Sequence, residues 1–286
     1  MKKILISLGM LLTQSVHAQL TPTENYIQSK TYLEPVTTSS STARQVETVQ
    51  YFDGLGRPKQ VVNVKASPLG RDVVTHIEYD GFGRQTMDYL PVPQSGTLNG
   101  GIAASPLANA TQPGIYGSEK IYSERTLESS PLDRLLEQRQ VGTDWANKPV
   151  RFQYEANVTG EVKKFVTTTT WVNGATQSTV NPATDPNSEN GFYKGGQLYK
   201  NTVTDEDGNK TIEFKNGRGQ TILTRKALSA TENADTYYVY NEYDQLAFVI
   251  PPLASVSGSL SPSTLDNLCY QYSYDGKNRL VEKKLP

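Results

Sequence analysis

Apolar and polar residues alternate with a period of two along most of this chain, which is the pattern of half-buried β-strands. In residues 71–79, Val73, Thr75, Ile77 and Tyr79 fall on one face, and the other face, with His76 beside Glu78, is polar and solvated. Ile212 and Phe214 likewise oppose Thr211, Glu213 and Lys215. Tyr270, Tyr272 and Tyr274 form a same-face aromatic row. The pattern therefore predicts a protein built mainly of antiparallel strands.

One turn chemistry recurs between these segments. A type I turn favours Asp, Asn or Ser at its first position and a residue that tolerates positive φ, usually Gly, at its fourth. Eight segments have this form: 53–56, 67–70, 80–83, 130–133, 205–208, 216–219, 241–244 and 275–278. The residues that we assign to the turns are Asp53, Gly56, Arg57, Gly70, Arg71, Asp80, Gly83, Arg84, Asp133, Arg134, Gly208, Gly219, Asp275 and Arg279. Where Gly is absent from the fourth place, Asp or Asn replaces it, and these residues best tolerate a left-handed backbone.

Other local signals give a hairpin, three loops and one short helix. Asn173-Gly174, between Phe165–Val172 and Ala175–Val180, is typical of a two-residue type I′ hairpin turn. Segments 94–117, 181–191 and 254–262, rich in Gly, Ala, Asn, Ser and Pro, read as surface loops. Ser263 and Asp266 have capping-box spacing and predict the start of one short helix.

The spacing of the turns predicts a repeat protein. The first three turns start 14 and 13 residues apart, so a strand pair recurs about every 27 residues, within the range of repeat architectures. We expect an all-β fold, an antiparallel β-hairpin repeat array forming a sheet or partial shell with few helices. The expected organisation is a signal peptide over 1–18, an N-terminal module over 19–93, a loop over 94–117, an irregular β region over 118–195 and further repeats over 196–286.

The first 18 residues have the features of a cleavable signal peptide. Lys2 and Lys3 precede the apolar run Ile4–Leu12, and Val16-His17-Ala18 places small or modest side chains before a cleavage point at Gln19. A buried N-terminal helix is the alternative. No later segment approaches the ~20 apolar residues of a membrane span. The sequence thus predicts secretion to the extracellular space or cell surface, with cleavage near Ala18.

Composition excludes several functional classes. The chain has 28 basic and 29 acidic residues, so nucleic acid is not expected as a partner. One Cys and two His exclude an intramolecular disulfide and any zinc or iron-sulfur site that needs several such ligands. Cys269 is expected to be a buried small hydrophobe rather than a nucleophile. With 36% hydrophobic residues the core is thin, and 17 Tyr supply amphipathic rings.

The turn sequences resemble those of a known family. Tyr79-Asp80-Gly81-Phe82-Gly83-Arg84 and Phe52-Asp53-Gly54-Leu55-Gly56-Arg57 are similar to the YD repeat of RHS-type proteins, as is Tyr274–Arg279 and, in degenerate form, Tyr240–Gln245. Residues 24–27 and 50–62 also resemble the N-terminal module of secreted RHS proteins of the Bacteroidetes type. The resemblance implies a wound β-sheet shell, with further C-terminal repeats, a core or a toxin cargo as partners. It also implies that some members bind surface glycans.

The family's self-cleaving core and a toxin domain are not visible in this sequence. Residues 281–285 read as a strand that still expects a partner, so we expect the chain to be a truncated segment of a larger wall.

Candidates for chemistry are weak. Arginines that follow turns are expected to bond neighbouring carbonyls or stack on Tyr, with a ligand-binding stripe as the alternative. Asp205, Asp207 and Asn209 alternate like the start of a calcium loop, but Lys210 stands where that loop needs Gly. His76 lacks the sequence context of a general base.

We therefore expect no catalytic residue, no metal and no cofactor. The expected function is a non-catalytic scaffold. A carbohydrate-binding adhesin module is the alternative, and an enzyme comes third.

Overall fold

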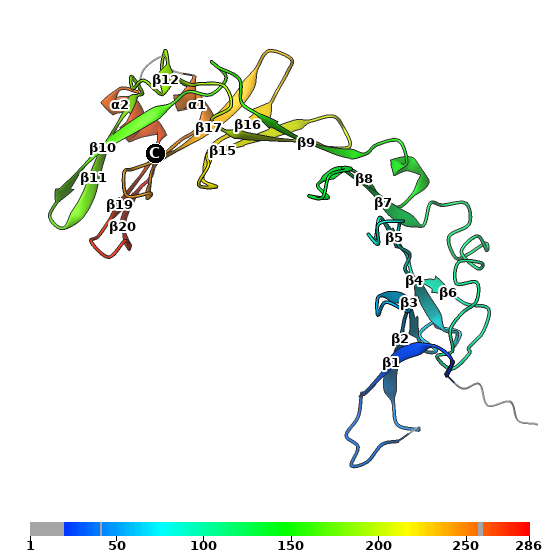
Figure 1. Cartoon of the computed structure of the whole chain (residues 1–286). Coiled ribbons are helices and arrows are strands. Elements are labelled where there is room, and N and C mark those ends of the chain that lie inside the picture. The colour runs from blue at the N-terminus through cyan, green and yellow to red at the C-terminus, as the bar shows by residue number, and fades with distance from the viewer. Residues whose placement is uncertain (1–19, 41, 257–259) are drawn as a thin grey trace, which may run out of the picture. The chain divides into compact units, whose positions relative to one another are not determined.

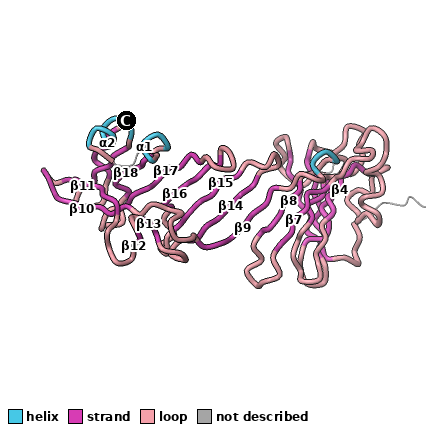
Figure 2. Tube along the Cα trace, turned by 90° about the horizontal axis from the view of Figure 1, so that it is seen from above, coloured by secondary structure: helices cyan, strands magenta, loops and turns pink. Residues whose placement is uncertain are grey.

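The computed structural model describes residues 20–40, 42–256 and 260–286 of the chain. The predicted signal peptide lies outside the described residues. The chain divides into two compact units: the first runs to Glu124 and includes Gln140–Thr143, and the second comprises Arg125–Arg139 and Asp144–Pro286. Strand β7 (Tyr122–Leu127) has residues in both units. Almost all regular structure is antiparallel β-sheet (Figures 1 and 2), which confirms the predicted fold class.

The first unit contains a five-stranded sheet in the order β1-β2-β3-β4-β6. Its strands are β1 (Asn25–Tyr32), β2 (Gln45–Phe52), β3 (Pro58–Asn63), β4 (Val73–His76) and β6 (Val92–Pro93). A further strand, β5 (Met87–Tyr89), pairs with residues 122–124 of β7. The sheet buries Val49, Tyr51, Val62 and Val74 on one face, because alternate side chains of neighbouring strands point the same way.

Strand β4 differs from the expectation at 71–79. It covers only Val73–His76. On the face predicted to be polar and solvated, Val74 and the preceding residue Asp72 are buried, at 1% and 2% exposure, whereas Glu78 is exposed. The loop over 94–117 lies against this face, with Ala103 joining Val74 in one cluster. The predicted loop therefore has no strand or helix, but it packs on the sheet and excludes solvent from Asp72.

The second unit is built on consecutive antiparallel strands in the order β8-β9-β14-β15-β16-β17-β18-β19-β20. They are β8 (Leu135–Arg139), β9 (Val150–Ala156), β14 (Tyr199–Thr204), β15 (Lys210–Lys215), β16 (Thr221–Ala227), β17 (Asn233–Tyr240), β18 (Leu246–Ile250), β19 (Tyr270–Tyr274) and β20 (Leu280–Lys284). Figure 2 shows β9, β14, β15 and β16 side by side in this order. Most connections are short turns, so sequence neighbours become sheet neighbours.

The exception is residues 157–198, which lie between the paired strands β9 and β14. They form the hairpin β10 (Phe165–Val172) and β11 (Ala175–Pro182) and the short pair β12 (Ser188–Glu189) and β13 (Phe192–Tyr193). Val172 pairs with Ala175 across Asn173 and Gly174, whose φ angles are 52° and 80°, so the hairpin turn is where the sequence predicts it. The hairpin contacts β17 and β19 (Figure 1).

The core of the second unit lies between this insertion and the sheet. Val162, Val180 and Leu198 of the insertion pack with a row of buried sheet residues. That row consists of Phe214, Leu223, Tyr237, Val239, Phe248 and Ile250. The insertion thus closes one face of the sheet.

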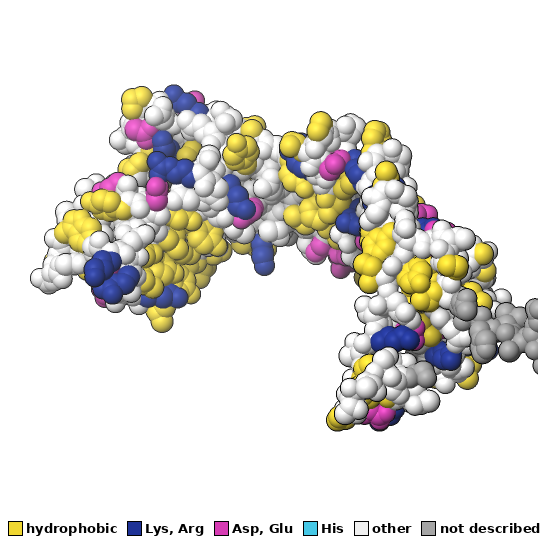
Figure 3. All heavy atoms as spheres, turned by 60° about the horizontal axis from the view of Figure 1, so that its bottom comes forward, with side chains coloured by type: hydrophobic (Ala, Val, Ile, Leu, Met, Phe, Trp, Pro, Cys, Tyr) yellow, Lys and Arg dark blue, Asp and Glu magenta, His cyan; other side chains and the backbone are white. Residues whose placement is uncertain are grey.

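The other face of the sheet carries tyrosines. Tyr238 pairs with Val249, and Val249 with Tyr270, so these side chains share the face opposite Val239 and Phe248. Tyr272 and Tyr274 continue the row on β19, and all of these tyrosines are half-buried. Figure 3 shows hydrophobic side chains gathered on the underside of this unit as Figure 1 draws it.

Helical structure is small and differs from the expectation in its boundaries. Helix α2 (Pro262–Leu268) begins after Ser261, whose hydroxyl accepts from the Thr264 N–H, so the predicted cap at Ser263 was wrong by two residues. Pro262 explains the shift, because Pro fits the first helical position and has no N–H to be capped. Helix α1 (Pro252–Ser255) and the 3₁₀ turn η1 (Thr143–Trp145) were not predicted. Across the described residues no helix is long and apolar enough to cross a membrane.

Candidate functional site

Six turns share one set of hydrogen bonds, and we call them the Asx turns. In each, the first residue is Asp or Asn, its N–H donates to the carbonyl of the fifth residue, and the N–H of the fourth residue donates back to its carbonyl. One side-chain oxygen of the first residue also accepts from the N–H groups of the third and fifth residues, at 2.8–3.0 Å. The Asx turns span 53–57, 80–84, 205–209, 216–220, 241–245 and 275–279.

The fourth residue of every predicted turn has a left-handed backbone. The φ angles are 77° at Gly56, 67° at Gly70, 79° at Gly83, 49° at Asp133, 88° at Gly208, 80° at Gly219, and 62° at both Asp244 and Asn278. This conformation explains why Gly, Asp and Asn alone occupy the position, since other L-residues are strained there.

The fifth residue closes the turn with its side chain. Arg57, Arg84 and Arg279 donate from Nε to the second oxygen of the first-position Asp, at 2.8, 2.8 and 2.7 Å. These are the arginines for which the sequence left a ligand-binding stripe open. In two other turns the charges are replaced by an amide pair, Asn216 with Gln220 and Asn241 with Gln245. The same backbone loop is thus held by an ion pair in some repeats and by neutral hydrogen bonds in others.

The hydrogen bonds lower the pKa of each first-position carboxyl. For Asp53 and Asp80 the largest cause is the hydrogen bond from the N–H of the fifth residue. For Asp205 and Asp275 it is the side chain of the fifth residue, Asn209 or Arg279. Donors aimed at a carboxylate favour its charged form, so all four aspartates are ionised in the folded protein at neutral pH.

Two turns that begin with Ser have different side-chain bonds. Ser67 keeps both backbone bonds, but its single hydroxyl accepts only from the Arg71 N–H and offers the Arg71 guanidinium no second oxygen. At 130–134 the backbone closes two residues earlier, where the Glu128 N–H donates to the Arg134 carbonyl. Arg134 also forms a bidentate pair with the Glu128 carboxylate, from Nε to Oε1 and from Nη2 to Oε2. This pair holds the pKa of Glu128 at about 2. Ser cannot bind the fifth residue twice, so Glu128 performs that task from outside the turn.

Tyrosines join successive hairpins to one another. The hydroxyls of Tyr79, Tyr154 and Tyr274 donate to the carbonyls of Pro58, Leu135 and Leu246, at 2.9, 3.0 and 3.1 Å. In all three cases the acceptor is the residue that follows the last residue of an earlier turn. We call these three hydrogen bonds the Tyr–carbonyl bonds. They fix each tyrosine against the start of a strand formed 19–28 residues before it.

Guanidinium groups lie over two of these rings. Arg57 Cζ is 4.3 Å from the centre of the Tyr79 ring, and Arg134 Cζ is 4.7 Å from that of Tyr154. Each of these arginines also pairs with a carboxylate, Asp53 or Glu128. Each guanidinium therefore makes two kinds of contact: its nitrogens pair with the carboxylate, and its planar face stacks on the ring of the following tyrosine.

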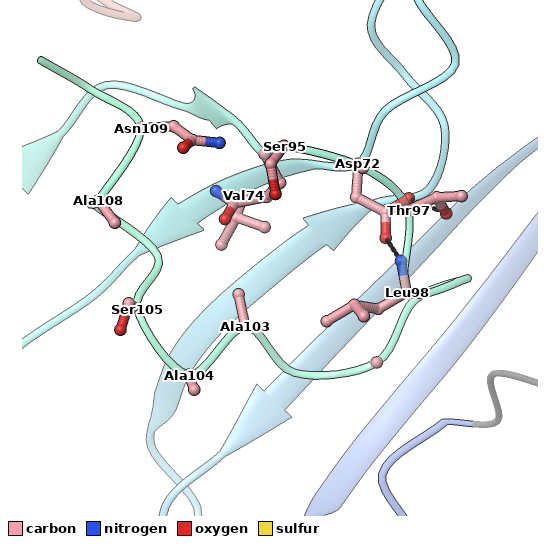
Figure 4. Close-up of a pocket in the computed structure, with 13 residues that line it drawn as sticks. Asp72, Val74, Ser95, Thr97, Leu98, Ala103, Ala104, Ser105, Ala108 and Asn109 are labelled. Carbon is pink, nitrogen blue, oxygen red and sulfur yellow. Dashed lines mark hydrogen bonds between the residues drawn. The ribbon is translucent and has the colours of Figure 1, made fainter. Parts of the chain in front are cut away.

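A pocket of about 340 Å³ lies in the first unit between β4 and the loop over 94–109 (Figure 4). The buried Asp72 carboxylate accepts from the Lys65 N–H, the Thr97 hydroxyl and the Leu98 N–H, at 2.9, 2.8 and 2.8 Å. Small side chains such as Ala103 and Ala108 line the rest of the pocket. Asp72 uses its oxygens to hold the loop, so its role here is structural.

The residues considered for catalysis do not form a site. His76 Nε2 lies 3.5 Å from Glu78 Oε2, and Tyr89 donates to the other oxygen of Glu78 at 2.9 Å. Cys269 is fully buried, as expected, and burial raises the pKa of its thiol to about 11. Asp205, Asp207 and Asn209 form an Asx turn, in which the Asp205 carboxylate accepts N–H groups. No group of three or more potential metal-ligating side chains occurs in the part of the chain that the structure describes.

Comparison with known proteins gives one family model and several distant structures. Residues 18–158, just under half of the chain, match the model of a family described as a domain of unknown function, DUF6443. The chain matches no curated protein.

The similar solved structures have much longer chains. A crystal structure of TcdB2-TccC3-Cdc42 has a TM-score of 0.47 and 13% identity, over 85% of this chain and 10% of that one. A crystal structure of TcdB2-TccC3 without its hypervariable C-terminal region has a TM-score of 0.45 and 13% identity, over 85% of this chain and 10% of that one. A crystal structure of TcdB2-TccC3 has a TM-score of 0.41 and 13% identity, over 85% of this chain and 12% of that one. This chain therefore spans about a tenth of the length of those chains.

We expect Gly83→Ala to destabilise the protein and Gly81→Ala, two residues earlier in the same turn, to leave it unchanged or slightly stabilised. Gly83 has φ 79°, and a Cβ there would lie 3.0 Å from Arg57 Nη1, whereas a Cβ at Gly81 would meet nothing within 4 Å. The left-handed backbone costs an L-residue roughly 1–2 kcal/mol, while Gly→Ala in a compatible backbone stabilises by about 0.4–1 kcal/mol. Urea unfolding measures the free energy of unfolding of both variants. Equal effects of the two substitutions would contradict the turn geometry.

Acid should weaken the Asx turns that begin with Asp. A carboxyl whose pKa is lower in the folded than in the unfolded state stabilises the fold at pH values above its unfolded pKa of about 3.9. This stabilisation is lost as the pH falls through the folded-state pKa. The melting temperature should therefore fall as the pH drops below about 4, in part through Asp53, Asp80, Asp205 and Asp275.

Asp275→Asn combined with Arg279→Gln copies the neutral pair Asn241–Gln245 and should reduce this acid dependence. Thermal melts between pH 6 and 2 test it. An unchanged acid profile in the double variant would exclude a contribution from Asp275.

Proposed function

We propose that this chain is a secreted, non-catalytic β-repeat scaffold, a wall segment of an RHS-type protein whose turns are YD repeats. The observation that carries the proposal is the repetition of one hydrogen-bonding scheme at six Asx turns together with the three Tyr–carbonyl bonds. The turn aspartates and the three tyrosines bond to the backbone of their own or a neighbouring hairpin. Arg57, Arg84 and Arg279 bond to the carboxylates of their own turns. Their repeated use supports a structural role, because each repeat has the same backbone groups to satisfy.

Export is the second part of the proposal. The charged start, short apolar run and cleavage-like end of residues 1–18 support a signal peptide and an extracellular or cell-surface location. Further β repeats, a core or a toxin cargo are the proposed partners. Nucleic acid is not a proposed partner, because the basic and acidic residues of the chain nearly balance.

Carbohydrate binding is the second candidate function. Tyr and Trp side chains that expose one face can stack on sugar rings, and this chain exposes both kinds of residue, with Trp171 at 47% and Tyr243 at 50%. This candidate adds a ligand to the scaffold and needs no catalytic group.

Removing the Tyr–carbonyl bonds should weaken the scaffold. We expect Tyr79→Phe, Tyr154→Phe and Tyr274→Phe each to lower the free energy of unfolding by about 0.5–1.5 kcal/mol, because each leaves a carbonyl without its donor. Tyr199→Phe is the matched control, since the Tyr199 side chain is 64% exposed, and it should change stability by less than about 0.5 kcal/mol. Urea unfolding provides the values. Turnover of a peptide or glycan library by the wild-type protein would overturn the non-catalytic part of the proposal.

N-terminal sequencing of exported protein tests the export proposal. Expression of the full chain in a secreting bacterial host should yield a product that begins at Gln19. A product that keeps residues 1–18, or that stays in the cytoplasm, would contradict the proposed location.

A further inference from the structure

An aromatic pair on the second unit has no part in the core or in the Asx-turn scheme. Trp171 lies near the end of β10 and Tyr243 at the third position of the turn 241–245. Their ring centres are 6.0 Å apart with an interplanar angle of 58°, and Trp171 Nε1 donates to the Tyr243 hydroxyl at 3.4 Å. Both side chains are about half exposed. The third position of the turn does not require an aromatic residue, because in the other five Asx turns it is occupied by Leu55, Phe82, Asp207, Arg218 and Lys277.

The surrounding structure holds this pair in place. Glu242, next to Tyr243, accepts from the Thr169 N–H at 2.9 Å and from the Thr169 and Thr167 hydroxyls at 2.8 and 3.2 Å. Three hydrogen bonds thus tie the turn 241–245 to β10, which is itself paired along its length with β11. Two rings fixed by separate backbone segments form a pre-organised platform, and a ligand that stacks on it loses little affinity to ordering the protein.

The setting of the pair favours a small, hydroxyl-rich ligand over a protein or a lipid surface. A stable protein interface takes about 800 Å² from each partner, whereas the exposed apolar residues at this place are Trp171, its neighbour Val172 and Tyr243. The strand residues around them are mainly Thr, Ser and Gln, and the nearby Arg218 is paired with Asp244, which leaves no net cation for anionic lipids. A sugar ring matches this arrangement, because its C–H face stacks on an aromatic ring while its hydroxyls meet a polar rim.

We propose that Trp171 and Tyr243 form the stacking platform of a saccharide-binding site, with Glu242 at its rim. The ligand class is a β-linked oligosaccharide of gluco configuration, since its equatorial hydroxyls leave flat C–H faces. Because the two rings are tilted by 58°, each ring stacks on a different face or sugar unit. The proposal gives a site to the carbohydrate-binding candidate above and rests on it for the class of ligand. It is independent of the export and stability predictions, which can succeed or fail by themselves.

The chain offers a direct probe of this site. It contains two tryptophans, and Trp145 is exposed to a similar degree, 43%, but lies in η1, where Lys148 Nζ sits 5.7 Å from its ring centre. Titration of the full chain with cellotetraose and with chitotetraose, followed by tryptophan fluorescence, should give a saturable change. The change should persist in Trp145→Phe and disappear in Trp171→Phe.

Isothermal titration with the better of the two sugars then separates the residues. Trp171→Ala and Tyr243→Ala should each weaken binding about tenfold or more, and Trp145→Ala should leave it unchanged. Thermal melts verify that the variants are folded, and Trp171→Tyr, which keeps an aromatic face, should restore part of the affinity. No saturable change with either sugar, or equal binding by wild type and Trp171→Ala, would overturn the proposal.

Discussion

The fold depends on one acceptor, the side-chain oxygen of the first residue in each Asx turn. That oxygen binds two N–H groups that the tight reversal of the chain would otherwise leave unpaired. With those groups satisfied, the backbone can reverse within five residues and place the next strand beside the last one. The scheme works with Asp or Asn at the first position, because the amide oxygen accepts equally well, as Asn216 and Asn241 show. The negative charge of Asp matters for the side chain of the fifth residue. An Arg at that position pairs with a carboxylate, whereas a Gln pairs with the neutral amide of Asn.

The Tyr–carbonyl bonds extend this local order to the next hairpin. Each tyrosine reaches back to the first carbonyl after an earlier turn, so the position of one turn fixes the lateral position of a later strand. Arg57 and Arg134 stack on two of these rings, which adds a nonlocal contact to a residue already fixed within its own turn. Stability of this kind accumulates between neighbours, as expected for repeat proteins. The second unit adds a true core only where residues 157–198 cover the sheet.

The positions of an Asx turn differ in whether they hold the fold together or are available for function. The side chains at the first and fifth turn positions are committed to closing the turn, and the fourth position is limited to residues that tolerate a left-handed backbone. The third position varies, and it carries residues as different as Leu55, Phe82, Arg218 and Tyr243. Leu55 and Phe82 are 79% and 86% exposed, so the side chain at this position makes little contact with the rest of the fold. Variation at this position can therefore create a surface such as the Trp171–Tyr243 pair without disturbing the fold.

The sequence by itself determined the all-β class, the eight turns and the Asn173-Gly174 hairpin, because each of these follows from the backbone preferences of neighbouring residues. Tertiary structure alone decided which face of a strand is buried. Asp72 looks solvated in the alternating pattern, yet loop residues 97 and 98, far along the chain, supply its hydrogen bonds and bury it beside Val74. Tertiary structure also decided that residues 157–198 cover the sheet and that Trp171 meets Tyr243 across 72 positions. Periodicity reports the spacing of side chains along one strand, and it holds no information about which distant segment packs against them.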